Sequence, residues 1–400
     1  SLSDTKDAVL IIGAGLAGVS AAEALREEGG PGEEIVVLGG EPELPYDHPP
    51  LSKGYLRGEA GDDDVRLHPR AWYAERGIDL RLGAVADAID PGRHDVTLAG
   101  GARERYDRLL LATGGRPRRL PVPGSDLDGV LTLRTVGDAD LIRAAAAEAG
   151  RCAVVGGGFI GVEVAASLRA LGVEVDLLMI EERVLEGPLG RALGERLTAL
   201  LRDRGVRVHP RAEVTAFHGE SELVSVAARG APAIQVPVAV VGAGIAPATE
   251  LAEAAGLQTD LGGIACDQAF RTSVPDVFAA GDVAAVWSPL AGRRLRVEHW
   301  AEALNQGKLA ARSMLDVEAA YDRVPYFFSD VFDSSIEYVG FGGPVEDEIA
   351  VERDGGMMAY HLSGDRLTGV AKLDVDDDLQ RARELLRAGA TRAEVEAEAG

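Results

Sequence analysis

The sequence predicts an α/β fold in which one supersecondary unit occurs twice and a C-terminal α+β domain follows. Each copy consists of an apolar run, a glycine-rich turn, a helical segment and a second apolar run, and the two copies span 8–38 and 152–180. From about residue 320 the chain becomes aromatic and strand-like, and 381–387 has the pattern of a helix. Repetition of a β-α-β unit predicts two parallel sheets covered by helices.

Length and composition limit the classes of function. A chain of 400 residues with 46% hydrophobic and 26% charged residues is typical of a soluble globular protein of two or three domains. The net charge of −24 argues against nucleic acid as a partner, because phosphate binding needs clustered Lys and Arg. No membrane span is expected, since no run of 18 apolar residues occurs, and the polar start of the chain lacks the features of a signal peptide. We therefore expect a cytoplasmic protein.

The two cysteines, Cys152 and Cys266, lie 114 positions apart in the sequence. No C-x-x-C or similarly spaced pair is possible, which argues against structural zinc and against a redox-active dithiol. Each cysteine belongs to an apolar run, and the expected role is that of a small buried hydrophobe. The sequence thus predicts no metal site.

The first glycine motif is Gly13-Ala14-Gly15-Leu16-Ala17-Gly18, between an apolar run and a helical segment. In such a motif the first glycine permits a tight turn, the second lets the backbone approach a pyrophosphate, and the third lets the helix pack closely. The N-terminus of the helix offers N–H groups and the positive end of its dipole to the phosphates. Glu41 follows the second apolar run and is well placed to accept hydrogen bonds from a ribose diol.

The second motif is Gly156-Gly157-Gly158-Phe159-Ile160-Gly161, and Glu163 follows on the first turn of the helix expected at 159–171. Met179 stands where the ribose-binding acid is expected, with Glu181 and another glutamate directly after it and Arg183 beyond. A carboxylate would favour NAD and an arginine NADP, and Met179 fits neither, so the choice between the two stays open.

A third segment, 272–282, is an apolar run that ends in Gly281-Asp282 and supports FAD rather than a second NAD. Together these motifs predict two Rossmann-like dinucleotide-binding domains of three layers, ββα. We divide the chain into a first part of the FAD-binding domain at 1–115, an NAD(P)-binding domain at 116–242, a second part of the FAD-binding domain at 243–319 and the C-terminal α+β domain at 320–400.

These motifs, in this order, give the chain a resemblance to the FAD-dependent pyridine nucleotide oxidoreductases. Within them it resembles the NAD(P)H–ferredoxin reductases of oxygenase and cytochrome P450 systems, and it is also similar to rubredoxin reductases and the apoptosis-inducing-factor group. The similarity covers nearly the whole chain, and its branch-specific segments are PPLSK at 49–53 and PYFFSD at 325–330. The further matching segments are 9–18, 45–48, 112–118, 133–135, 156–163, 241–244, 271–282 and 297–300.

The resemblance implies roles for several positions. Lys53 would lie near the flavin and pair with Glu163 beside the nicotinamide, and these two are the candidate catalytic residues. Arg134 would contact FAD and Asp282 would bind its ribityl chain. Trp300 would lie near the isoalloxazine, and Tyr326 and Phe328 would lie near its solvent side. His48 stands where this family often has Arg, which weakens one expected phosphate contact. The cofactor-binding candidates are Gly13, Gly15, Leu16, Ala17, Gly18, Glu41, His48, Lys53, Val85, Ala112, Thr113, Gly114, Arg118, Arg134, Gly156, Gly158, Phe159, Ile160, Gly161, Glu163, Glu181, Gly242, Gly244, Gly281, Asp282, Glu298, His299, Trp300 and Phe328.

The implied activity is that of an oxidoreductase of the ferredoxin–NAD(+) reductase type. NADH, with NADPH possible, would give a hydride to FAD, and single electrons would pass to a [2Fe–2S] ferredoxin that serves an oxygenase or a P450. The alternative is an NAD(P)H oxidase or a redox sensor of the apoptosis-inducing-factor type without a ferredoxin. A basic segment, Arg293, Arg294 and Arg296, is the local feature that would favour an acidic protein partner.

Overall fold

The computed structural model describes residues 7–29 and 32–400, and these form two units, each assembled from three stretches of the chain. The first unit takes in the described residues of Ser1–Asp47, Val65–Arg116 and Ala246–Pro325. The second unit consists of His48–Asp64, Pro117–Ile245 and Tyr326–Gly400. Each unit contains one copy of the repeated β-α-β unit, and each is described by itself below.

The first unit is built on a parallel sheet with the strand order β20-β7-β1-β2-β3. Every pair of neighbouring strands in it is parallel, so all five carboxyl ends meet at one edge. Its strands are buried apolar runs at the centre, as expected where both faces of a parallel sheet are covered. The strands are β1 (Ala8–Ile12), β2 (Glu34–Gly39), β3 (Ile78–Leu82), β7 (Arg108–Leu111) and β20 (Val277–Ala279).

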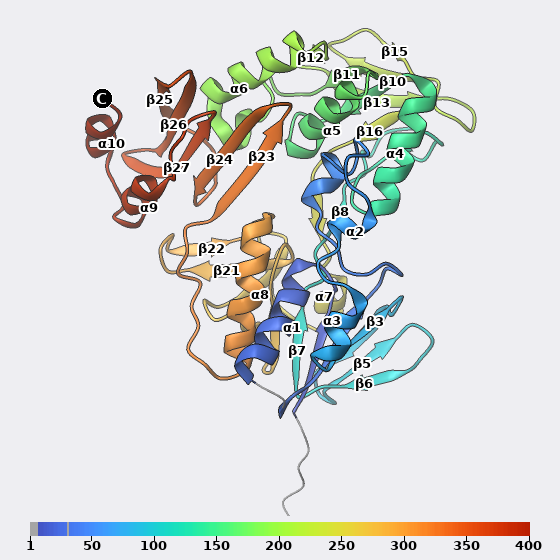
Figure 1. Cartoon of the computed structure of the whole chain (residues 1–400), viewed down its shortest axis with the longest axis vertical. Coiled ribbons are helices and arrows are strands. Elements are labelled where there is room, and N and C mark those ends of the chain that lie inside the picture. Colours follow the sequence, from blue (N-terminus) through green and yellow to red (C-terminus); the bar gives the residue numbers. More distant parts are fainter. Residues whose placement is uncertain (1–6, 30–31) are drawn as a thin grey trace, which may run out of the picture. The chain divides into compact units, whose positions relative to one another are not determined.

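Helices α1 (Leu16–Gly29) and α8 (Trp300–Met314) lie beside each other in the first unit (Figure 1). Their approach requires a glycine, because a Cβ at Gly307 would lie 2.3 Å from the carbonyl oxygen of Ala17. The remaining elements of this unit are α3 (Arg70–Glu75), α7 (Glu250–Ala254), an antiparallel sheet of β4 (Ala86–Asp90), β5 (Asp95–Leu98) and β6 (Arg103–Arg105), and a mixed sheet of β18 (Thr259–Asp260), β19 (Gly263–Cys266), β21 (Ala284–Ser288) and β22 (Arg293–Leu295).

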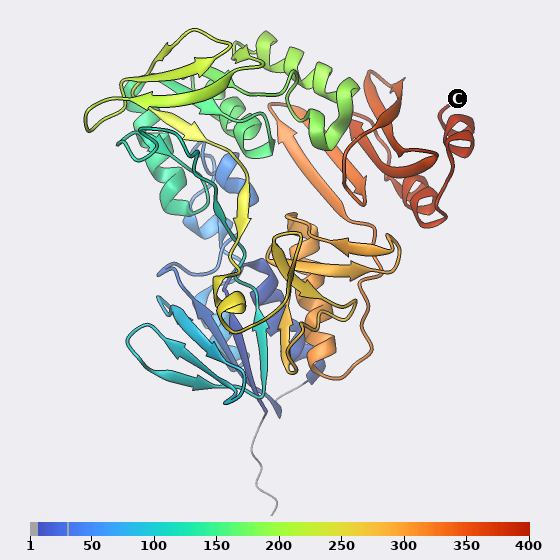
Figure 2. The same cartoon turned by 180° about the vertical axis from the view of Figure 1, so that it is seen from behind.

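The second unit repeats this plan with a parallel sheet of order β12-β11-β10-β16-β9. A three-stranded antiparallel sheet packs on it (Figure 2). Apolar side chains of both sheets, among them Val155, Leu178, Phe217 and Val226, form one core. The parallel strands are β9 (Val130–Leu131), β10 (Arg151–Val155), β11 (Glu174–Leu178), β12 (Arg207–His209) and β16 (Ala239–Val241), and the antiparallel ones are β13 (Glu213–His218), β14 (Ser225–Arg229) and β15 (Ile234–Gln235).

Helices of the second unit have identifiable starts and one kink. Helix α4 (Val136–Ala149) begins at a capping box in which the side chain of Thr135 accepts from the N–H of Asp138. Helix α5 (Phe159–Ala170) follows the second glycine motif, and the 3-10 helix η2 (Pro49–Ser52) contacts both α4 and α5. Helix α6 (Glu186–Asp203) is interrupted at Gly190, whose φ is 81°.

The C-terminal part of the second unit is an antiparallel sheet of order β23-β24-β27-β26-β25 with two helices. It is joined to α6 by Glu348, whose Oε1 accepts from the N–H of Ala192 at 2.8 Å, directly after the kink. The elements are β23 (Tyr326–Val331), β24 (Ser334–Gly340), β25 (Asp347–Arg353), β26 (Gly356–Ser363), β27 (Arg366–Leu373), α9 (Gln380–Arg387) and α10 (Arg392–Ala399). The remaining elements of the chain are α2 (Asp62–Val65) and a two-stranded sheet of β8 (Gly115–Pro117) and β17 (Ile245–Pro247).

The predicted fold class is confirmed, since two parallel sheets with their helices and a C-terminal α+β part are present. The expected strand within 272–282 is shorter than the apolar run, because Asp276 has a positive φ of 64° and the strand starts only after it. The four-part domain division stays a prediction. Within 7–29 and 32–400, no helix is long and apolar enough to cross a membrane.

Candidate functional site

The glycine turn between β1 and α1 combines two glycines that packing requires with one that it does not. Gly13 has a φ of +116°, and a Cβ there would lie 2.0 Å from the carbonyl oxygen of Ala112. A Cβ at Gly18 would lie 2.0 Å from the carbonyl oxygen of Gly13. At Gly15 a Cβ would meet nothing within 4 Å, so the open space beside this residue suits a pyrophosphate that approaches the backbone.

The same edge of the first sheet gathers most of the other candidates of this unit. Because the strands are parallel, the residues that follow them lie at one edge, which is where ligands bind in open α/β sheets. Leu16 and Ala17 open α1 after β1, Glu41 follows β2, Val85 follows β3, Ala112, Thr113 and Gly114 follow β7, and Gly281 and Asp282 follow β20.

Hydrogen bonds fix two aromatic side chains near this edge. The hydroxyl of Tyr46 donates to Oε2 of Glu41 at 2.6 Å. Nε1 of Trp300, the first residue of α8, donates to Oδ1 of Asp47 at 2.7 Å. Burial raises the pKa of Asp47 although this hydrogen bond opposes the rise. Burial also lowers the pKa of His299 to about 4, so this candidate is a neutral imidazole at pH 7.

Gln306 is a buried residue of α8 that the sequence analysis did not single out. Its Oε1 accepts from the N–H of Gly281 at 2.9 Å, and the residue has no exposed surface. It therefore holds the turn that presents Asp282, the residue to which the resemblance gives the ribityl chain of FAD. Its position within an ordinary helical pattern carries no local sequence signal.

Replacing Gln306 with leucine should weaken FAD binding and destabilise the protein by about 1–3 kcal/mol, because the buried N–H of Gly281 loses its acceptor. FAD occupancy after gel filtration and thermal unfolding measure the two effects. Asn305→Leu is the matched control, since the Nδ2 of Asn305 donates only within the helix, to the carbonyl of Ala301. Equal FAD loss in both variants would show that Gln306 has no special part in the site.

The turn between β10 and α5 in the second unit repeats the geometry of the first. Gly156 has a φ of +118°, and a Cβ there would lie 2.2 Å from the carbonyl oxygen of Gly242. A Cβ at Gly161 would lie 2.0 Å from the carbonyl oxygen of Gly156, whereas at Gly158 it would meet nothing within 4 Å. Phe159 and Ile160 then begin α5. This turn therefore has the same geometry as the first and leaves open space beside Gly158 that suits a second dinucleotide.

Glu163 is the fifth residue of α5, just beyond the first turn on which it was expected, and it is the centre of a buried polar cluster. Its Oε2 accepts from the hydroxyl of Ser52 at 2.5 Å, and its Oε1 accepts from Ser329 at 2.6 Å. Nζ of Lys53 lies 3.5 Å from the same Oε1 and 5.0 Å from the ring centroid of Phe328. The side chains of Lys53 and Glu163 are only 13% and 8% exposed, so the pair is largely removed from water.

Three elements far apart in the sequence build this cluster, namely η2, α5 and β23. The hydroxyl of Ser167 in α5 donates to the carbonyl of Ser52 in η2 at 2.7 Å. Phe159 in α5 meets Phe327 in β23 edge to face, with ring centroids 4.9 Å apart. These contacts hold η2 and β23 against α5.

The remaining candidates of the second unit lie at strand ends or in loops. Desolvation, helped by the charge of Arg134, lowers the pKa of His48 to about 3, so the side chain is neutral at pH 7 and does not replace the charge of an arginine. The N–H of Arg118 donates to the carbonyl of Gly244 at 2.9 Å. Gly242 follows β16 at the carboxyl edge of the sheet, and Glu181 follows β11 there.

The basic segment has a weaker net charge than the sequence suggests. Arg294 pairs with Asp260 at 3.3 Å, and Arg296 forms an ion pair with the candidate residue Glu298. Neighbouring carboxylates therefore compensate the charges of two of the three arginines. The pairing of Arg294 with Asp260 could not be predicted from the sequence, because the two residues lie 34 positions apart. The expected basic patch for an acidic partner is correspondingly reduced.

Ser52 and Ser329, the partners of Glu163, were not among the residues expected at the site. Both lie inside the segments PPLSK and PYFFSD that carry the resemblance, so these segments themselves were the available signal. Neither cysteine is a reactive thiol at neutral pH, because burial raises the pKa of Cys152 and of Cys266 to about 12. Over 7–29 and 32–400 there is no group of His, Cys, Asp and Glu that could hold a metal ion.

Two glycine cradles on two parallel sheets define a protein that binds two dinucleotides. The family of pyridine nucleotide-disulphide oxidoreductases matches residues 7–307, and the chain belongs to this family. It is an oxidoreductase that uses FAD and a nicotinamide dinucleotide, as the open space at Gly15 and Gly158 allows.

Known relatives agree with this assignment. The ferredoxin–NAD(+) reductase component of the anthranilate 1,2-dioxygenase system of Burkholderia cepacia is 38% identical over 395 residues, which cover 96% of this chain and 95% of the relative. The ferredoxin reductase for the CYP199A2 system from Rhodopseudomonas palustris has a TM-score of 0.92 at 31% identity, with 99% of this chain and 98% of the other covered. The reductase in the covalent putidaredoxin reductase–putidaredoxin complex has a TM-score of 0.89 at 32% identity, with 96% and 93% covered.

Proposed function

We propose that this chain is the NADH-dependent reductase that passes electrons singly to a [2Fe–2S] ferredoxin of an oxygenase or cytochrome P450 system. The observation that carries the proposal is the pair of dinucleotide cradles in a chain whose two thiols are both buried and held protonated. Electrons that enter from the nicotinamide therefore have no dithiol to leave through. A relative named as a ferredoxin–NAD(+) reductase component supports the one-electron acceptor.

The residues of the chain would hold and orient the two dinucleotides. FAD, when bound, accepts the hydride and passes on the electrons, which is the cofactor's own chemistry. Gly13, Gly15 and Gly18 would hold it, with Glu41 at a ribose and Asp282 at the ribityl chain. The N-terminal N–H groups of α1 and α5 would bind the two pyrophosphates.

Lys53 and Glu163 would act where the hydride is transferred. A cation beside the flavin stabilises negative charge on the flavin ring. Lys53 in that place would therefore favour the reduced form of the flavin. Glu163 fixes the position of the Lys53 side chain, because the two form an ion pair with little solvent around it. The two serine hydroxyls on Glu163 satisfy the carboxylate, so the pair is held without a buried unpaired oxygen.

Reduction of the bound flavin by NADH under anaerobic conditions tests the first half of the proposal. Ferredoxin-dependent reduction of cytochrome c, measured with a panel of [2Fe–2S] ferredoxins, tests the second half. We expect flavin bleaching at stoichiometric NADH and at least about tenfold faster cytochrome c reduction with the cognate carrier.

Bleaching followed by rapid reoxidation in air, with no ferredoxin effect, would instead indicate the oxidase. A long-lived complex of reduced flavin with NAD+, again without a ferredoxin effect, would indicate the sensor. A cytoplasmic location belongs to this proposal, because the reaction consumes NADH.

A further inference from the structure

The hydrogen-bond registers of the two parallel sheets align the two copies of the β-α-β unit. Ile12 pairs with Leu38 in the first sheet, and Val155 pairs with Leu178 in the second. In each copy, the N–H of the motif's first glycine donates to the carbonyl oxygen of the leucine in this pair. Gly13 donates to Leu38 at 2.9 Å, and Gly156 donates to Leu178 at 2.8 Å. Leu178 is therefore the equivalent of Leu38.

Counting on from these leucines changes the identity of the expected ribose acid in the second cradle. Met179 corresponds to Gly39, and Glu181 corresponds to Glu41, each glutamate standing three positions after its leucine. A count from the last glycine of each motif places Met179, rather than Glu181, near the acid's position. The helix and loop of the first copy are longer, which shifts that count.

The packing of the aligned positions supports this alignment, because a small residue in one copy corresponds to a large residue in the other and its neighbour changes in the opposite sense. In the first copy Gly39 makes room for Ala14, because a Cβ at Gly39 would lie 2.9 Å from the Cβ of Ala14. In the second copy Met179 is large and 2% exposed, and the residue opposite is Gly157. A Cβ at Gly157 would lie 2.8 Å from the sulfur of Met179 and 3.5 Å from Oε2 of Glu181. The carboxylate of Glu181 thus lies against the glycine turn.

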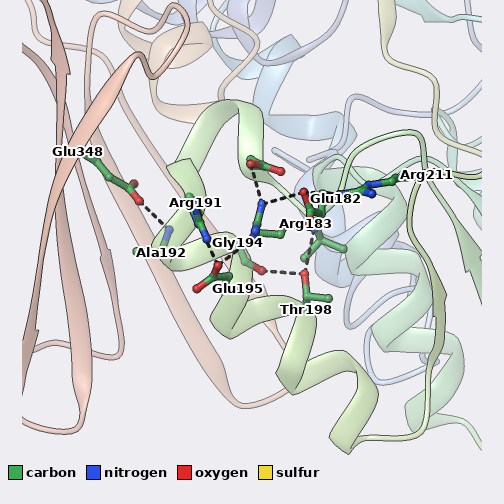
Figure 3. A network of polar contacts seen from close by, with 11 residues as sticks. Glu182, Arg183, Arg191, Ala192, Gly194, Glu195, Thr198, Arg211 and Glu348 are labelled. Carbon is green, nitrogen blue, oxygen red and sulfur yellow. Dashed lines mark hydrogen bonds and ion pairs between the residues drawn. The ribbon is translucent and has the colours of Figure 1, made fainter.

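Two arginines near Glu181 are already paired with carboxylates. Arg183 lies 3.6 Å from Glu182, 3.1 Å from Glu186 and 3.1 Å from Glu195. Arg211 lies 2.9 Å from the same Oε2 of Glu182, so this carboxylate contacts both arginines (Figure 3). The hydrogen bond from Arg211, together with the charge of Arg183, lowers the pKa of Glu182 and keeps it ionised.

We propose that Glu181 is the ribose acceptor of the second cradle and that Glu182 withholds Arg183 and Arg211 from a 2′-phosphate, so that this chain selects NADH against NADPH. The inference rests on the proposed use of the second cradle for the nicotinamide dinucleotide. A carboxylate accepts hydrogen bonds from a ribose diol and repels a phosphate in the same place. An arginine that could bind the phosphate is neutralised in advance by its acidic neighbours.

Equilibrium binding of NAD+ and of NADP+ to the oxidised, FAD-loaded protein tests this inference without any electron acceptor. The wild type should bind NAD+ at least about tenfold more tightly than NADP+. Glu181→Gln should weaken NAD+ binding about tenfold or more, the usual effect of losing hydrogen bonds to a charged group, and leave NADP+ unchanged or improved. Glu182→Gln should improve NADP+ binding about tenfold and leave NAD+ nearly unchanged.

Glu174→Gln is the matched control, because Glu174 opens the same strand β11 at the opposite edge of the sheet and pairs with Arg207. It should alter neither affinity. Equal affinities of the wild type for both nucleotides, or unchanged NAD+ binding by Glu181→Gln, would overturn the inference. If the nucleotide preference depends on Glu181 and Glu182 as stated but no ferredoxin is reduced, the proposed function falls while this inference stands.

Discussion

Glu163→Gln should slow the reduction of bound flavin by NADH about a hundredfold, with much less effect on NADH affinity. The carboxylate is the anion that fixes Lys53, with 3.5 Å between Nζ and Oε1. An amide in its place still accepts from Ser52 or Ser329 but carries no charge to attract the ammonium, so the lysine side chain is no longer held in position. Misplacement of one group at a reacting centre by about 1 Å costs about that factor in rate. Stopped-flow absorbance of the flavin under anaerobic conditions measures it.

Lys53→Met should combine a similar loss of rate with a loss of stability of about 3–5 kcal/mol, because it leaves the buried carboxylate of Glu163 without its cation. The double variant, Lys53→Met with Glu163→Gln, should recover most of that stability and none of the rate. This non-additivity separates a functional pair from a structural one. Lys308→Met, at an exposed position of α8, is the control for loss of a lysine. Flavin reduction within about threefold of the wild-type rate in Glu163→Gln would argue against a role in hydride transfer.

The glycine motifs and apolar runs were sufficient to predict the two parallel sheets, because they report local properties of the chain. Gly13 and Gly156 are required by their positive φ, and Gly18 and Gly161 are required by the close approach of the carbonyl oxygens of Gly13 and Gly156 within the same turns. The same applies to the expected helix at 159–171, which ends one residue earlier than the pattern, at Ala170. Local patterns of this kind carry over to structure with small boundary errors.

The contacts around Glu163 could not be derived from local pattern, because they join residues 111 and 166 positions apart in sequence. The same holds for Gln306, whose acceptor role toward Gly281 depends on the packing of α8. The expected position of the ribose acid at Met179 depended on a count of residues from the glycine motif. That count is not transferable, because the segment between the motif and the second strand differs in length between the copies. Only the hydrogen-bond register restores the equivalence of Glu41 and Glu181.

Gly158→Ala should abolish most nicotinamide binding while the protein stays as stable as the wild type. Gly158 has φ −80° and ψ −174°, which alanine adopts without strain, and its new methyl group would meet no protein atom within 4 Å. Stability should therefore change by no more than about 1 kcal/mol, because the lower entropy of alanine in the unfolded chain opposes its weaker preference for the N-cap of α5. The methyl group instead occupies the space through which a pyrophosphate approaches the backbone, so we expect at least about a thirtyfold weaker affinity for NAD+.

Gly156→Ala, two residues earlier, should behave in the opposite way. It forces alanine to a φ of +118° and places a Cβ 2.2 Å from the carbonyl oxygen of Gly242, so it should destabilise the protein by about 3–5 kcal/mol. Thermal unfolding and NAD+ titration of both variants, with FAD absorbance as the check on the first cradle, distinguish the two roles of glycine. If Gly158→Ala bound NAD+ as tightly as the wild type, the open space beside this residue would not be the phosphate cradle, because a methyl group cannot share it with a pyrophosphate.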